Sequence, residues 1–235
     1  MTSKLKNIQF FTALNVDAMF FHSAVNNLTD ATKNKAVADA TNEELNCIPW
    51  LDDYEVWDIG DEIDVSFSNE QIMYVEGLKD KAKAAFSRFL QATATTHMFC
   101  VAALEAHINK IASSSIKAKM FDHYEKLSIE GKWLLLPQLL GKSGFEPGHQ
   151  PFQDFSHLIK TRNALVHYKG KKIPGFYADS TDLYKPLGLT VEEAHTSVEA
   201  TKKMIVRLAE VMELAPPKWI QDTAAEYLNV EVVWE

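Results

Sequence analysis

The stretch FQDFSHLIKTRNALVHYKG, residues 152–170, shows most directly how this chain folds. Its apolar residues recur at steps of three and four, the spacing that places side chains on one face of an α-helix. That face consists of Phe155, Leu158, Ile159, Arg162 and Val166. Gly170 is placed to end the helix, because glycine readily adopts the left-handed conformation found at helix C-termini. The stretch therefore predicts an amphipathic helix with one buried face.

Helical spacing continues on the N-terminal side of this stretch. From Asn69 to Ile111 it predicts one long helix or two in series, and the serines at 113–115 interrupt it. Two shorter helical patterns follow, one over residues 121–127 and one in KWLLLPQLL, residues 132–140. Gly141 and Gly144 are the expected stops of the second pattern.

The C-terminal side is also helical in pattern. Thr190 precedes Glu193 by three residues, which is the form of a capping box, and opens an apolar stripe that reaches Met212. Two prolines at 216 and 217 stop this helix. A last helix over Lys218–Leu228 and a terminal strand over Val230–Trp234 are expected after it. The predicted fold class is mainly α, a bundle of about four core helices with at most a small peripheral β element.

Residues 1–75 carry a weaker pattern. The apolar residues between Phe10 and Phe21 cluster as in a helix, whereas Asn26–Asn46 is polar and indicates a loop or a marginal helix. Alternating apolar residues at 63, 65 and 67 indicate a short β-hairpin through Glu55–Phe67. We therefore expect three parts: an acidic N-terminal extension over 1–75, the helical bundle over 76–215, and a C-terminal helix and tail over 216–235.

Composition limits the class of protein. The 235 residues are 46% hydrophobic and 24% charged, as in globular proteins, and no apolar run approaches the length of a membrane span. The N-terminus lacks the pattern of a secretory signal. Cys47 and Cys100 are too few for a four-cysteine zinc site and too far apart for a CxxC pair. We expect a cytoplasmic protein that needs no membrane and no cofactor.

Charge is distributed unevenly along the chain. A net charge of -8 argues against a protein that coats nucleic acid with its whole surface, since such binding depends on Lys and Arg at phosphates. The stretch Asp30–Asp80 holds 14 acidic residues and three lysines, which on its own indicates a solvated face. By contrast, Lys160–Lys172 holds five basic residues and no acidic one.

Common catalytic motifs are absent from the sequence. It contains no GxxxxGK phosphate loop, no GxGxxG, no HExxH and no GxSxG elbow. Eight histidines are scattered, and neither Glu105 with His107 nor Asp122 with His123 shares a helix face. The histidines are therefore expected to be ordinary surface or half-buried side chains, and no metal site is predicted.

The exception is RNALVH at residues 162–167. It resembles the signature of the HEPN superfamily, in which four to six residues separate an Arg from a His and an Asn often follows the Arg. The order of helices from Glu76 to Ala215 is also similar to the four-helix HEPN bundle. The resemblance implies a homodimer with its cleft between protomers, and a metal-independent endoribonuclease of the kind found in defence and toxin–antitoxin systems.

Helix geometry limits how these residues could cooperate. Asn163 and His167 lie one turn apart on the same face, but Arg162 points about 140° away from His167 in an ideal helix. The two converge only if the helix ends or distorts near Tyr168, or if a second subunit completes the pocket.

The expected roles follow from the chemistry of RNA cleavage. His167 would move protons near neutral pH, and Arg162 would hold the phosphate and stabilise the charge of the transition state. Asn163 would orient His167 or the phosphate. Single-stranded RNA would follow Lys160, Lys169, Lys171 and Lys172, with Tyr168 stacking on a base. The products would be a 2′,3′-cyclic phosphate and a 5′-hydroxyl.

Two other interpretations remain open. Arg162 could pair with an acid such as Glu105 while His167 caps its helix, which would make both residues structural. Alternatively, the chain could be a non-catalytic HEPN-like dimerisation or interaction module that binds a nucleotide or a protein partner, whereas an antitoxin is a possible partner of the ribonuclease. A basic partner would then dock on the acidic stretch Asp30–Asp80.

Overall fold

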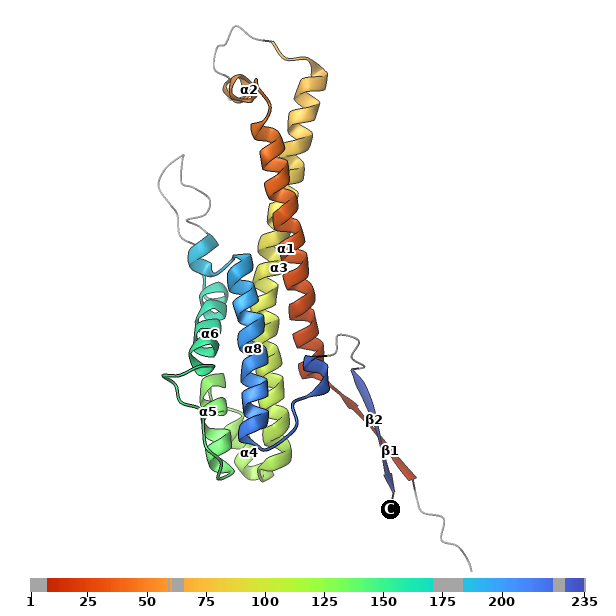
Figure 1. The fold of residues 1–235 in the computed structure, drawn as a ribbon, viewed down its shortest axis with the longest axis vertical. Helices are drawn as coiled ribbons and strands as arrows, with labels where there is room; N and C mark the ends of the chain where they lie inside the picture. The colour runs from red at the N-terminus through yellow and green to blue at the C-terminus, as the bar shows by residue number, and fades with distance from the viewer. Residues whose placement is uncertain (1–7, 59, 61–65, 171–183, 222–226, 235) are drawn as a thin grey trace, which may run out of the picture.

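The structure is a computed structural model that describes residues 8–58, 60, 66–170, 184–221 and 227–234. It is mainly helical, as predicted (Figure 1). Its long helices are α1 (Val16–Asn46), α3 (Asn69–Ser115), α6 (Phe152–Val166) and α8 (Val191–Val211). The shorter ones are α2 (Leu51–Asp58), α4 (Ala118–Tyr124), α5 (Ile129–Leu139) and the single 3-10 turns η1 (Lys185–Leu187) and η2 (Lys218–Ile220).

Helix α3 is the axis of the molecule. Its 47 residues form one continuous helix, about 70 Å long, rather than two in series. A capping box starts it: the amide of Gln71 donates to the Ser68 hydroxyl and the Ser68 amide donates to the Gln71 side chain. The helix ends at Ser115, within the predicted serine break.

The core lies where α1, α6 and α8 pack against the second half of α3. Its fully buried side chains include Leu104, Ile108, Trp133, Phe155, Met204 and Leu208. Helix α8 begins at the predicted cap, since the Thr190 hydroxyl accepts from the Glu193 amide at 3.2 Å. In Figure 1, α5 and α6 lie on the opposite side of α8 from α1.

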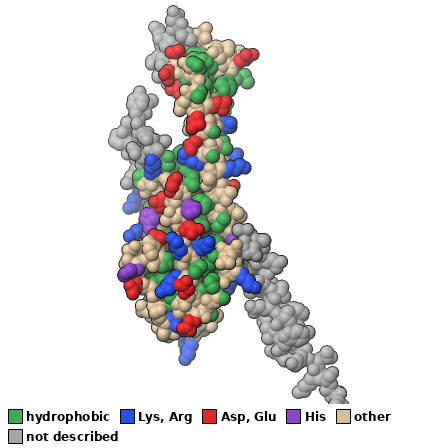
Figure 2. All heavy atoms as spheres, viewed as in Figure 1, with side chains coloured by type: hydrophobic (Ala, Val, Ile, Leu, Met, Phe, Trp, Pro, Cys, Tyr) green, Lys and Arg blue, Asp and Glu red, His purple; other side chains and the backbone are tan. Residues whose placement is uncertain are grey.

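Helices α1 and α3 continue beyond the ends of α6 and α8 as a projecting arm, which we define as residues 38–58 and 66–82 (Figure 1). A separate small core closes its end, with Leu45, Tyr54, Val75 and Leu78 buried beneath α2. The Tyr54 hydroxyl also donates to Glu76 at 2.9 Å. Acidic side chains lie beside apolar ones at this end of the molecule in Figure 2.

The structure corrects several expectations for residues 1–75. Asn26–Asn46 is not a loop but part of α1, which buries a narrow line of small residues against α3. Residues 55–58 belong to α2, so the predicted hairpin is wrong there, and residues 61–65 lie outside the described part. The boundary at 75/76 falls inside α3, and Ala18 and Phe21 are in the main core. The first half of α1 is therefore an integral part of the bundle.

The chain ends also differ from the prediction in part. The terminal strand exists as β2 (Leu228–Trp234), and it pairs antiparallel with β1 (Ile8–Leu14). The helix-like cluster expected over Phe10–Phe21 is therefore a strand up to Leu14, while its second half is helical in α1. The expected helix over Lys218–Leu228 is only the turn η2 before residues 222–226, which lie outside the described part. These two strands pair ends of the chain more than 200 residues apart, with Ile8 opposite Trp234. No described helix has the length and apolar character needed to cross a membrane.

Candidate functional site

Helix α6 positions the RNALVH motif at its C-terminal end. Phe155, Leu158 and Ile159 are buried as predicted and fix the helix against the core. The helix ends at Val166, and His167 is its C-cap, with the His167 amide donating to the Asn163 carbonyl at 2.9 Å. Gly170 has a positive φ of 67°, but it follows the helix end by several residues and does not cap it. The motif therefore forms the last turn of a firmly packed helix.

The three residues expected to be catalytic have different surroundings. Arg162 and Asn163 are half-buried, while His167 is exposed. No described residue gives the side chain of Arg162, Asn163 or His167 a hydrogen bond or an ion pair. Arg162 lies within α6, whereas His167 is its C-cap, with φ of -102° and ψ of 21°. The helix therefore ends directly before Tyr168, which is where an ending is needed if Arg162 and His167 are to converge within one chain.

The expected RNA-contacting residues are only partly described. Lys160, Tyr168 and Lys169 are exposed around the end of α6. Lys171 and Lys172 lie outside the described residues. Val166, 52% exposed, adds an apolar side chain to this surface.

The structural alternative for Arg162 is wrong. Glu105, its suggested partner, instead accepts from the ammonium of Lys132 at 2.9 Å. Lys132 is itself buried, so this carboxylate compensates a charge that the core encloses. His167 caps α6 through its backbone amide rather than its ring.

A buried polar cluster supports the turn beside Arg162. The ring of His97 on α3 donates from Nε2 to the Gly188 carbonyl at 2.9 Å, and its Nδ1 accepts from the Ser197 hydroxyl of α8 at 2.8 Å. Burial lowers the pKa of His97, which outweighs the hydrogen bond to Gly188, so the ring is neutral. Gly188 has a positive φ of 69° and lies against Thr161, the residue before Arg162. His97 therefore ties the end of η1 and α8 to α3, and Gly188 lies against Thr161 of α6.

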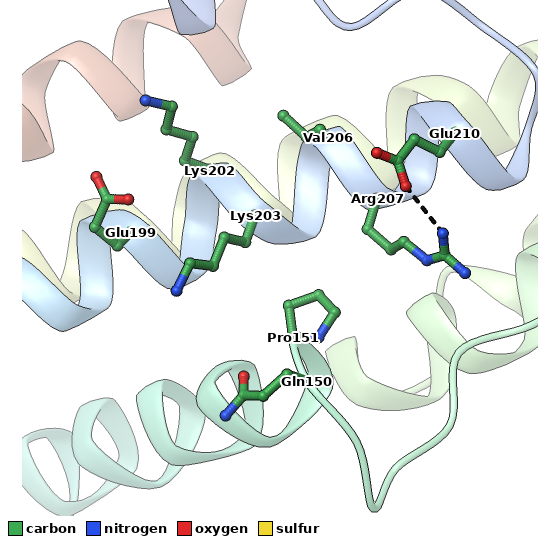
Figure 3. Close-up of a pocket in the computed structure, with 8 residues that line it drawn as sticks. All are labelled: Gln150, Pro151, Glu199, Lys202, Lys203, Val206, Arg207 and Glu210. Carbon is green, nitrogen blue, oxygen red and sulfur yellow. Dashed lines mark hydrogen bonds and ion pairs between the residues drawn. The ribbon is translucent and has the colours of Figure 1, made fainter.

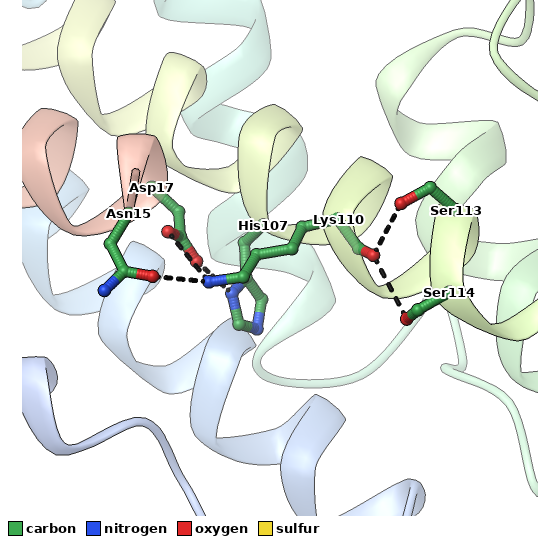
Figure 4. A network of polar contacts seen from close by, with 6 residues as sticks. All are labelled: Asn15, Asp17, His107, Lys110, Ser113 and Ser114. Carbon is green, nitrogen blue, oxygen red and sulfur yellow. Dashed lines mark hydrogen bonds and ion pairs between the residues drawn. The ribbon is translucent and has the colours of Figure 1, made fainter. Parts of the chain in front are cut away.

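A second polar network, which the sequence did not reveal, lies at the base of α1 (Figure 4). The carboxylate of Asp17 is 1% exposed and accepts from Nδ1 of His107 at 2.9 Å. The ammonium of Lys110 lies 3.6 Å from the other Asp17 oxygen and donates to Asn15 at 2.8 Å. Burial raises the pKa of Asp17, but the hydrogen bond from His107 and the charge of Lys110 outweigh it and lower the pKa. The sequence signal was weak, because 90 residues separate Asp17 from His107.

The described histidines do not cluster into one site. His22 donates from Nε2 to the Trp219 carbonyl at 2.8 Å, so it ties η2 to α1. Among the described residues there is no group of three or more His, Cys, Asp or Glu side chains that could hold a metal ion. The buried histidines found here, His22, His97 and His107, join helices and turns instead.

Comparison with known proteins assigns no family to the chain. No protein-family model, curated protein or solved structure matches it.

Proposed function

We propose that the chain is a HEPN-type endoribonuclease that cleaves single-stranded RNA without a metal ion, with its site at a homodimer interface. The observation that carries the proposal is the placement of Arg162, Asn163 and His167 on the last turn of a rigid helix, with no described side-chain partner. An arginine with only a structural role is usually paired when it is half-buried.

The geometry of α6 supports a two-chain site. Side chains five residues apart point about 140° from each other on an ideal helix, and two copies of α6 facing each other would bring Arg162 of one chain beside His167 of the other. The exposed Val166 supplies apolar surface for such a contact. In that pocket, imidazole would take the proton of the 2′-hydroxyl, and guanidinium would hold the phosphate as negative charge builds up.

The test is cleavage of a labelled pool of single-stranded RNA in EDTA by the wild type, Arg162→Ala and His167→Ala. We expect products with 2′,3′-cyclic phosphate ends from the wild type only. Arg88→Ala and His123→Ala are matched controls, because both residues are exposed and distant in sequence from the motif. Cleavage that survives in folded His167→Ala would overturn the assignment.

The dimer is tested by sedimentation equilibrium. We expect Val166→Asp to shift the protein toward monomer and to abolish cleavage, since a charge at the contact is costly to bury. Cleavage by a protein that is monomeric at the assay concentration would contradict a shared site.

A second candidate function is a non-catalytic interaction module, which the arm favours. Its end exposes Met73, 76% accessible, and Tyr74 beside acidic residues. Exposed apolar side chains with surrounding charge are typical of protein-binding surfaces. If this second function holds, we expect a dimer in which neither the wild type nor any variant cleaves RNA. A basic protein partner should bind the arm, and its affinity should fall as the salt concentration rises.

A further inference from the structure

A pocket of about 520 Å³ lies between the start of α6 and α8 (Figure 3), but its charges do not select a ligand. The ammonium groups of Lys202 and Lys203 extend to opposite sides of α8 in the figure. Arg207, which also lines the pocket, donates to Glu210 at 2.9 Å, so its charge is compensated. The strands β1 and β2 give a stronger indication of a binding surface.

These two strands form a sheet that extends away from the helices in Figure 1. In the described part of the chain each strand pairs only with the other, so each has one edge with no strand beside it. Leu14, the last residue of β1, is 54% exposed. A sheet of two strands is at best marginally stable in water, whereas three or more strands with an apolar face can be stable. The two strands are therefore expected to gain stability from a further strand.

The register gives this sheet one strongly apolar face. Because β1 and β2 pair without a bulge from Ile8 opposite Trp234 to Leu14 opposite Leu228, directly opposed residues share a face. The even-numbered positions of both strands therefore lie on one face. They are apolar except for Thr12: Ile8, Phe10, Leu14, Leu228, Val230, Val232 and Trp234.

The free edge of β1 has none of the features that usually prevent strand pairing. Exposed edges are commonly protected by proline, by charged residues or by a bulge. The sequence of β1, IQFFTAL, contains no proline, no glycine and no charged residue. By contrast, β2 has Glu231 at its centre, and pairing of two β2 strands would place Glu231 opposite its own copy, where like charges repel. The edge suited to a further strand is therefore that of β1.

Strand β1 is also complementary to a second copy of itself. Two identical strands that meet across a two-fold axis pair antiparallel. With the axis at the central residue, Phe11 lies opposite Phe11 of the second copy, a favourable aromatic pair, and Ile8 lies opposite Leu14. Even-numbered positions again lie opposite even-numbered ones, so the apolar face continues across four strands.

We propose that the outer edge of β1 is a self-association surface, at which two copies of the chain form one four-stranded sheet in the order β2–β1–β1–β2. The proposal does not depend on ribonuclease activity. It also uses a different part of the chain from the contact proposed at α6.

Cross-linking of the full chain tests the surface and its register. Cys47→Ser removes the exposed native thiol, Cys100 is buried, and Phe11→Cys is then added. Directly opposed residues of antiparallel strands have Cα atoms about 4.5–5.5 Å apart, which a disulfide can span. We therefore expect mild oxidation to join two copies through residue 11.

Ala13→Cys in the same Cys47→Ser chain is the matched control. Its two thiols would lie four residues apart along the paired strands, or about 14 Å, which a disulfide cannot span. We expect Phe11→Cys to cross-link faster than Ala13→Cys by roughly tenfold or more. Val166→Asp should leave cross-linking at residue 11 unchanged, so failure of the α6 contact is distinguished from failure of this one.

Amide hydrogen exchange followed by NMR tests the same surface in the unaltered chain. In an isolated pair of antiparallel strands, alternate amides of each strand point to the free edge and exchange rapidly. Pairing through β1 should protect every amide from residue 9 to residue 13, while β2 keeps its alternation. Protection of only alternate amides in β1 would overturn the proposal, and so would cross-linking of Ala13→Cys as fast as that of Phe11→Cys.

Discussion

Asp17 shows how a single buried carboxylate can hold two helices together. It lies in the first turn of α1 and receives its hydrogen bond from His107, near the C-terminal end of α3. Its pKa is lowered in the folded protein relative to an ordinary value near 3.8, so folding favours the ionised form. Ionised Asp17 therefore stabilises the folded protein at pH values above about 3.8. This contribution is lost as the pH falls through the lower pKa that Asp17 has in the folded state.

We predict that Asp17→Asn lowers the free energy of unfolding by about 1–3 kcal/mol near pH 7, because His107 and Lys110 lose their anion. The difference from the wild type should be smaller at pH 3, below the ordinary value of 3.8, and should shrink further as the pH falls toward the lowered pKa of Asp17 in the folded protein. Urea unfolding at both pH values measures this. Asp39→Asn removes an exposed carboxylate paired with Lys35 and should change stability by less than about 1 kcal/mol. A difference that grows on acidification would contradict the sign of the pKa shift.

At the scale of elements, the turn between η1 and α8 depends on a glycine. Gly188 adopts φ 69°, and a Cβ there would lie 2.7 Å from a methyl carbon of Thr161. Side chains rarely adopt this backbone conformation, and Thr161 belongs to packed α6. The left-handed turn allows η1 to contact α6 closely.

We predict opposite effects of alanine at two glycines. Gly188→Ala should destabilise the protein by about 1–3 kcal/mol through strain and the contact with Thr161. Gly77→Ala lies inside α3 with open space around it and should stabilise by about 0.5–1 kcal/mol through helix propensity. Thermal or urea unfolding of both variants is the measurement, and shifts in the same direction would be inconsistent with this explanation.

Helix α1, much of which the sequence indicated only as a loop or a marginal helix, has a physical reason for its weak pattern. Its contact line follows a seven-residue spacing, with Ala24, Ala31, Ala38 and Leu45 buried. Such spacing is typical of coiled-coil seams, but alanine gives little apolar contrast. On α3 the buried residues of this part recur at alternating steps of three and four: Val75, Leu78, Ala82, Ala85, Phe89 and Ala92. Small residues let the two helices approach closely, so the seam becomes evident only when both are considered together.

At the scale of the whole molecule, the arm and the bundle have separate cores. The arm's end buries few side chains, whereas the main core collects residues from α1, α3, α5, α6 and α8. Regions with few buried apolar contacts open with a lower free energy than the global core. The arm is therefore expected to open locally while the bundle stays folded.

Hydrogen exchange followed by mass spectrometry tests this difference. We predict that Val75→Ala increases exchange in residues 38–58 and 66–82 and leaves α6 and α8 protected. Leu104→Ala should instead lower the stability of the whole molecule by about 2–5 kcal/mol, because it leaves a cavity in the main core. Equal loss of protection in arm and bundle with Val75→Ala would show that the two cores unfold together.

Local patterns in the sequence determined the helical class, the burial of Phe155, Leu158 and Ile159 on α6, the cap of α8 and the serine break after α3, whereas Val166, expected on the same buried face, is 52% exposed. These features depend on residues within a few positions of one another, so spacing and capping suffice to predict them. Tertiary structure alone decided the pairing of β1 with β2, the contact of Asp17 with His107, and the placement of α1 along α3. Each of these joins residues far apart in the chain, and its free energy comes from contacts that exist only once the chain has closed on itself.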